Sequence, residues 1–126
     1  MGNGAQATAS NAVAMGNGAQ ATASNAVAIG NTATANGEDA FALGSYSTSS
    51  GVHSIAFGVS ASAGTTPSGS IAYDALAFGY LSQARGSRTI VIGKEAYAEQ
   101  NNAIAIGGSD SGAGYTSAKG QHATPS

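Results

Sequence analysis

Large and small side chains alternate along this chain in short blocks that end at regularly spaced glycines. The glycines recur at every fourteenth position, with one longer step between Gly58 and Gly79, and the full series is Gly2, Gly16, Gly30, Gly44, Gly58, Gly79, Gly93 and Gly107. If each such glycine is position 0, large apolar side chains stand at +11 and +13 and small ones at +10 and +12, as in the segment Ala40-Phe41-Ala42-Leu43. Alternation with a period of two predicts a β-strand that ends just before each glycine.

A second, weaker alternation follows each glycine. Small side chains occupy +3 and +5, as Ala19 and Ala21 do, and polar side chains such as those of Gln20 and Thr22 occupy +4 and +6. Each repeat therefore predicts two short strands and two tight turns, with glycine suited to turns that need positive φ. Residues 1–14 and 15–28 are identical, and stacking such units predicts an all-β parallel solenoid with a rung spacing of about 4.8 Å.

The alternation leaves open which side of the first strand faces the interior. We predict that the large residues form the core of the roll, facing the small residues of the second strand: Val13, Val27, Ile29, Phe41, Leu43, Ile55, Phe57, Leu76, Phe78, Ile90, Ile92, Ile104 and Ile106. The small residues at +12 would then form an exposed stripe and an oligomer interface: Ala14, Ala28, Ala42, Ala56, Ala77, Val91 and Ala105. The glycines predicted to lie in turns are Gly16, Gly30, Gly44, Gly58, Gly79, Gly93 and Gly107. The opposite assignment, with alanine inside and large residues at the interface, stays open, although it would make a very thin roll.

The spacing divides a single β-roll over 1–126 into regular coils 1–58, an expanded coil 59–79, regular coils 80–107 and an expanded, truncated coil 108–126. The seven extra residues of the expanded coil fall within 63–74, where the density of Pro and Gly predicts a protruding loop. We predict that the 65–74 excursion is dispensable for folding, so that seven residues can be deleted there. Because Met1 is itself a repeat position and the last coil stops before its strand, we expect the chain to be a fragment of a longer protein.

Composition fits a thin repeated core and excludes several functional classes. Charged residues are 8% of the chain, the net charge is −2 and there is no cysteine. There is thus no disulfide framework, no thiolate metal site and no basic footprint for nucleic acid. No apolar run approaches the length of a membrane span, so we predict no membrane contact by this fragment.

Candidate chemistry is sparse, and we predict no catalytic, cofactor-binding or metal-binding residue. His53 is interpreted as a solvated turn residue, and no partnering constellation surrounds it or His122 in the sequence. The pair Glu38-Asp39 is also interpreted as a solvated turn, and 107–110 as a plain loop and not a calcium repeat. Arg85 and Glu99 share position +6 on successive rungs and could pair.

The five tyrosines lie off the large-residue positions, at Tyr46, Tyr73, Tyr80, Tyr97 and Tyr115. We interpret them as packing on turns in preference to acting as interface anchors, although tyrosine is frequent at interfaces.

The segments Asn25-Ala26-Val27-Ala28-Ile29-Gly30 and Asn102-Ala103-Ile104-Ala105-Ile106-Gly107 resemble the YadA-like head repeat of trimeric autotransporter adhesins. The resemblance covers nearly the whole chain. It implies a left-handed parallel β-roll in a side-by-side homotrimer, exposed on the bacterial cell surface beyond the outer membrane. The chain departs from the family pattern by having Ala in place of Ser before Val in most repeats, and Val91 in place of Ala.

The favoured function is therefore that of an adhesin head, which would bind host cells, other heads, or extracellular matrix proteins of the collagen, fibronectin or laminin class. An ice-binding solenoid or a purely structural spacer is the alternative. Ice binding would need a ladder of one residue type, whereas position +4 is mixed. An enzyme with a solenoid fold would need clustered acids or histidines, and the few charges of this chain do not cluster.

Overall fold

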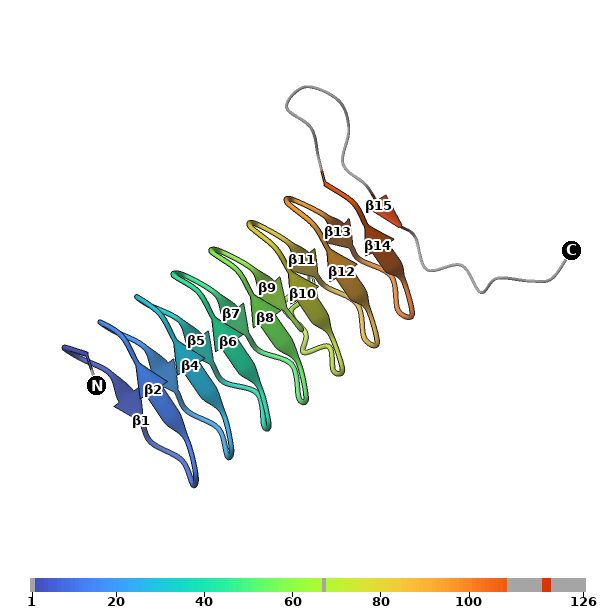
Figure 1. Cartoon of the computed structure of the whole chain (residues 1–126). Coiled ribbons are helices and arrows are strands. Elements are labelled where there is room, and N and C mark those ends of the chain that lie inside the picture. The colour runs from blue at the N-terminus through green and yellow to red at the C-terminus, as the bar shows by residue number, and fades with distance from the viewer. Residues whose placement is uncertain (1, 67, 109–116, 119–126) are drawn as a thin grey trace, which may run out of the picture.

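The chain folds into a parallel β-solenoid whose coils stack along one axis (Figure 1). This computed structural model describes residues 2–66, 68–108 and 117–118. Each coil contributes one strand to each of two parallel sheets, as the alternation predicts. The described strands of the eight-stranded sheet are β1 (Gln6–Ala7), β3 (Gln20–Ala21), β5 (Thr34–Ala35), β7 (Thr48–Ser49), β9 (Ser62–Ala63), β11 (Gln83–Ala84), β13 (Tyr97–Ala98) and β15 (Ser117–Ala118).

The second sheet carries the strands that end just before the glycines. These are β2 (Val13–Met15), β4 (Val27–Ile29), β6 (Phe41–Leu43), β8 (Ile55–Phe57), β10 (Leu76–Phe78), β12 (Ile90–Ile92) and β14 (Ile104–Ile106). Equivalent positions pair from rung to rung, with Ala28 opposite Ala42. The register continues across the expanded coil, where Ala77 lies opposite Ala56. The predicted repeat thus sets the register of the whole roll.

Two four-residue turns close each coil at opposite edges. At the glycine edge, defined by the turns that begin at position 0, the N–H of Ala19 donates to the carbonyl of Gly16. At the ladder edge, defined by the turns from +7 to +10, the N–H of Ala26 donates to the carbonyl of Ala23 in the same way. The seven glycines from Gly16 to Gly107 that open the first turn have φ between 126° and 138°. A Cβ on Gly44 would lie 2.4 Å from the carbonyl oxygen of Gly58, so backbone approach between rungs also demands glycine there.

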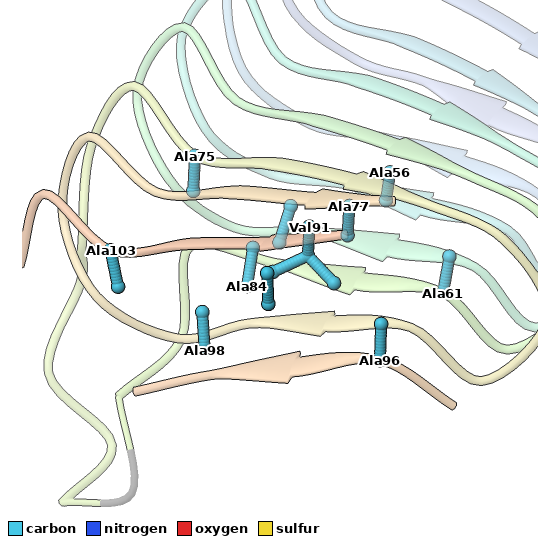
Figure 2. Packing of buried hydrophobic residues seen from close by; sticks show 11 residues of the cluster. Ala56, Ala61, Ala75, Ala77, Ala84, Val91, Ala96, Ala98 and Ala103 are labelled. Carbon is cyan, nitrogen blue, oxygen red and sulfur yellow. The ribbon is translucent and has the colours of Figure 1, made fainter. Parts of the chain in front are cut away.

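The interior of the roll is lined by small side chains from both sheets. Alanines at +3 and +5 of one sheet face alanines at +10 and +12 of the other, and their sticks fill the space between the two layers in Figure 2. The bulkiest fully buried side chains are Val91 and Thr89, which lie in the same coil. An alanine methyl excludes little water by itself, so the stability of this core comes from its repetition along the axis.

This arrangement reverses the predicted assignment of the two sides of the first strand. The residues predicted to form an exposed interface stripe are all buried inside the roll: Ala14, Ala28, Ala42, Ala56, Ala77, Val91 and Ala105. The residues predicted to form the core alternate with them and are all exposed or half-buried on the outer side: Val13, Val27, Ile29, Phe41, Leu43, Ile55, Phe57, Leu76, Phe78, Ile90, Ile92, Ile104 and Ile106. The physical reason lies in the turns. Most of them close within four residues by a backbone hydrogen bond, and this draws the two sheets too close together for Ile or Phe between them.

Buried hydroxyls replace alanine in the middle coils, and all of them are hydrogen-bonded. The hydroxyls of Ser47, Ser82 and Thr89 each donate to the carbonyl that opens their own turn, at 2.8 Å. Among the described residues, no buried side-chain polar atom lacks a partner. Serine and threonine therefore enter this core without the cost of an unsatisfied group.

Candidate functional site

The outer side of the seven-stranded sheet is a continuous apolar surface, which we call the large-residue face. It is formed by the side chains at positions +11 and +13 of successive repeats, carried by β2, β4, β6, β8, β10, β12 and β14. The side chains at the two ends of the roll are the most open, and Ile106 is 64% exposed. Even in the middle, Ile55 is 41% exposed. A monomeric soluble protein rarely leaves so long an apolar surface in water.

Neighbouring rungs pack against each other on this face. The rings of Phe57 and Phe78 are stacked, with centroids 4.7 Å apart and planes 3° apart. Their ladder partners are aliphatic, with Leu43 below and Ile92 above. The stacked rings and their aliphatic neighbours thus form a continuous apolar centre of the face, which can pack against an identical face.

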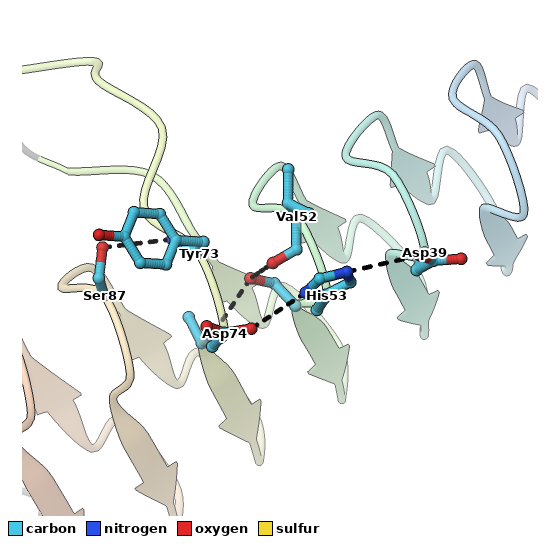
Figure 3. Close-up of polar contacts among 8 residues, drawn as sticks. Asp39, Val52, His53, Tyr73, Asp74 and Ser87 are labelled. Carbon is cyan, nitrogen blue, oxygen red and sulfur yellow. Dashed lines mark hydrogen bonds and ion pairs between the residues drawn. The ribbon is translucent and has the colours of Figure 1, made fainter.

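A column of polar side chains runs up the ladder edge at position +9. Asn11 donates to Asn25 at 3.0 Å, and Asn25 donates to Asp39 at 2.8 Å. His53 follows, with Nε2 3.5 Å from an Asp39 oxygen and Nδ1 3.2 Å from an Asp74 oxygen (Figure 3). All five residues have φ between 54° and 58°, a conformation that Asn and Asp tolerate better than most residues.

His53 and Asp39 are exposed turn residues, as predicted from the sequence. Their contact with each other was not predicted. The signal was present in the repeat itself, since Asn25, Asp39 and His53 occupy the same position of three successive repeats. Exposed pairs of this kind contribute only about 0–1 kcal/mol each, so the column organises the edge more than it stabilises the roll.

The outer side of the eight-stranded sheet, which we call the polar face, carries the side chains at positions +4 and +6. It reads Gln20, Thr34, Thr48, Ser62, Gln83 and Tyr97 along the +4 column. An ice-binding surface would require one residue type repeated along the column, and the polar face does not provide it.

One cluster of charges stands on the polar face near its C-terminal end. The predicted Arg85–Glu99 pair is mediated by a third residue, because the Tyr97 hydroxyl donates to Glu99 while the Arg85 guanidinium lies 5.2 Å from the Tyr97 ring centroid. The hydrogen bond to Glu99 raises the pKa of Tyr97, helped by partial burial and opposed by the nearby Arg85 charge.

The remaining described tyrosines are exposed, contrary to the interpretation that they pack on turns. Tyr46 is 59% exposed, and Tyr73 and Tyr80 are about half exposed. Tyr73 does have a local partner, since the Arg88 guanidinium lies 5.8 Å from its ring centroid. Tyr115, His122 and residues 109–110 lie outside the described residues.

The described part of the chain offers little for bond-making chemistry. No group of three or more His, Asp or Glu residues there could hold a metal ion, and the Asp39–His53–Asp74 column is no exception. Nor does any helix in those ranges have the length and apolar character needed to cross a membrane. The arrangement is one of extended surfaces, which suits binding and assembly.

Comparison with known proteins agrees with the repeat. The family model described as "YadA head domain repeat (2 copies)" matches residues 1–19, 21–47, 49–73, 70–96 and 84–109, which together cover most of the chain. A comparison with curated proteins gives no significant match.

Proposed function

The chain belongs to the YadA head domain family, a non-enzymatic family of trimeric adhesin heads displayed at the cell surface, and we propose from this premise that it binds an extracellular matrix protein or a host-cell receptor. The ligand class that we propose is that of collagen, fibronectin and laminin. The binding unit is a homotrimer of parallel left-handed rolls, side by side.

The observation that carries this proposal is the large-residue face. It runs the length of the roll, and its central residues Ile55 and Phe57 remain about 40% exposed in the single chain. Complete burial of one such side chain stabilises an assembly by about 1.5–3 kcal/mol. Three rolls that turn this face toward a common axis would remove all seven rungs from water at once, and this replaces the alanine stripe as the proposed interface.

The same packing would leave the polar face of each roll pointing away from the axis. Gln20, Thr34 and Thr48 present amide and hydroxyl groups there with no charge. Contacts of this kind bind weakly one at a time. Presentation of three copies at high effective concentration multiplies the affinity for a fibrous ligand with repeated sites.

The test combines mass in solution with binding to immobilised collagen, fibronectin and laminin. The double variant Ile29→Asp with Ile55→Asp puts six carboxylates at the trimer axis and should be monomeric, with adhesion reduced by about a hundredfold or more. Gln20→Glu with Thr34→Glu adds the same two carboxylates per chain on the polar face; it is the control and should remain trimeric.

Two results would contradict the proposal. If the double variant keeps the mass of a trimer, the large-residue face is not the interface. If the wild-type trimer binds none of the matrix proteins and no host cells, the roll is a structural spacer.

A further inference from the structure

Five large apolar side chains are exposed among the described residues without belonging to the large-residue face. They are Tyr46, Val59, Ile71, Tyr73 and Tyr80, each between 45% and 59% exposed. All five fall between positions 46 and 80, in three neighbouring coils of the roll. Among the described residues, large apolar side chains that are exposed outside the large-residue face are therefore confined to three neighbouring coils.

The five residues divide between the two edges of the roll. Tyr46, Val59 and Tyr80 lie on successive turns of the glycine edge, just before β7, β9 and β11. Ile71 and Tyr73 lie on the ladder edge, in and beside the inserted loop 65–71 that follows β9. The strands of each coil connect its two edges, so these two groups lie within the same three coils on opposite sides of the roll.

The loop is built as a small hairpin that carries Ile71 outward. Thr65 and Ile71 form an antiparallel bridge, and the N–H of Ala72 donates to the carbonyl of Gly64 at 2.9 Å where the loop closes. The Thr66 hydroxyl donates to the carbonyl of Ser70 at 3.1 Å inside the loop. The apolar side chain of Ile71 is thus held on a hydrogen-bonded support.

Tyr46 is placed by the regular turn of its repeat. Its φ is 60°, and Thr32, Ser60 and Leu81 at the same position of other repeats have φ of 56° to 57°. The turn therefore holds the Tyr46 side chain at the glycine edge, where it is 59% exposed.

We infer that loop 65–71 of one protomer packs against Tyr46, Val59 and Tyr80 of its neighbour, as a side clasp between subunits. The inference rests on the proposed trimer. In a closed ring of identical subunits the contacts are heterologous, so the glycine edge of each roll faces the ladder edge of the next. Apolar groups at one height on both edges then meet, whereas a single chain cannot bring them together across the width of its own roll.

The clasp gives the trimer a unique register. The first two repeats are identical, and their edges carry Asn3 and Asn17 on one side and Asn11 and Asn25 on the other. If one roll slipped by one rung relative to its neighbour, asparagine would still face asparagine at these edges. It would move Ile71 away from its matching patch, so the clasp penalises the slipped assembly.

Cysteine cross-linking tests this contact directly, because the chain has no cysteine of its own. Val59→Cys with Ile71→Cys should give covalently closed trimers when the folded protein is treated with a short bismaleimide and run on a denaturing gel. The control, Asn17→Cys with Ile71→Cys, places the glycine-edge thiol three rungs lower, about 14 Å away along the axis, and should remain uncross-linked. Each single variant should also remain uncross-linked.

The outcomes separate the clasp from the trimer. A species with the mass of a trimer in solution that yields no covalent trimer from the Val59–Ile71 pair overturns the clasp and leaves the proposed function standing. A species with the mass of a monomer overturns the proposed assembly itself. Equal cross-linking of the control pair means that the rolls lack a fixed register and also overturns the clasp.

Deletion of residues 65–71 supplies an independent readout. Joining Gly64 to Ala72 restores the regular turn spacing, so the variant should fold and remain trimeric. Exchange of subunits between labelled and unlabelled trimers should become about tenfold faster or more, because lost contacts act mainly on dissociation. An unchanged exchange rate would show that the loop of one subunit does not hold the next.

Discussion

The inner and outer sides of a single strand in this protein differ sharply in the size and exposure of their side chains. In β8, Ala56 is fully buried in the roll, while Ile55 and Phe57 on either side of it point outward and are about 40% exposed. The smallest apolar side chain is inside and the larger ones are outside, the reverse of an ordinary globular strand. The inner side serves the fold of one chain, and the outer side is the surface that we propose to be covered by the other chains of a trimer.

The largest expected effect comes from a charge on the inner side. Ala56→Asp would bury a carboxylate between two sheets that leave room only for a methyl, at a cost of about 3–5 kcal/mol. We expect the coils around β8 to unfold and the melting temperature to drop steeply, because each coil is supported only by its neighbours. Thermal unfolding followed by circular dichroism measures this, and wild-type melting would place Ala56 on the surface.

The adjacent residue should behave differently. Ile55→Asp keeps the roll folded, because its side chain already contacts water in the single chain, but it places three carboxylates together in the assembly. We expect the dissociation constant of the trimer to rise by a hundredfold or more, at about 1.4 kcal/mol per factor of ten. Sedimentation analysis over a range of concentrations gives this number. Loss of folded structure in the dilute monomer would contradict the distinction between the two sides.

The glycine turns, which hold the two sheets close together, offer a further test of why the inner side accepts only small residues. Gly44→Ala should cost about 1–3 kcal/mol, because Gly44 has φ of 135° and a Cβ there would lie 2.4 Å from the Gly58 carbonyl. Gly69→Ala is the matched control, since φ is also positive but nothing lies within 4 Å of the added Cβ. Denaturant unfolding of the two variants separates the effect of rung contact from that of φ, and equal losses would argue against the rung contact.

The smallest expected effect concerns the polar face. The pKa of Tyr97 is raised in the folded protein, chiefly by its hydrogen bond to Glu99. The stability that this residue contributes is therefore complete below about pH 10 and is lost as the pH rises through the raised pKa. The wild type should exceed Tyr97→Phe in denaturant midpoint at about pH 8, and the difference should shrink at about pH 11. A difference that grows with pH would reverse the sign of the shift.

The sequence predicts the fold well because the repeat carries so much of it. Period-two alternation and the glycine spacing give the strands, the parallel register and the place of the inserted loop between Gly58 and Gly79. Alternation alone cannot tell the inside from the outside, since both sides of a strand are equally periodic. The residues that decide the question are the ones that close the turns, and their effect on the distance between sheets is a three-dimensional property.

Contacts on the surface of the roll could also be predicted in part from the repeat. The polar column at Asn25, Asp39 and His53 could have been found by reading one repeat position up the stack, because side chains at equal positions become neighbours. The Arg85–Tyr97–Glu99 contact could be anticipated only in part. Arg85 and Glu99 share a position, but the intervention of Tyr97 depends on side-chain conformations that the repeat does not specify.

The identity of the first two repeats has a consequence for how such a protein changes over generations. Residues 1–14 and 15–28 have the same sequence, and the second copy pairs with the first copy and with the following coil in the same register. Unequal recombination within the gene can therefore add or remove a whole repeat without disturbing the cross-section. Each event would lengthen or shorten the head by about 4.8 Å. The distance that the head extends from the cell surface can therefore change in fixed steps.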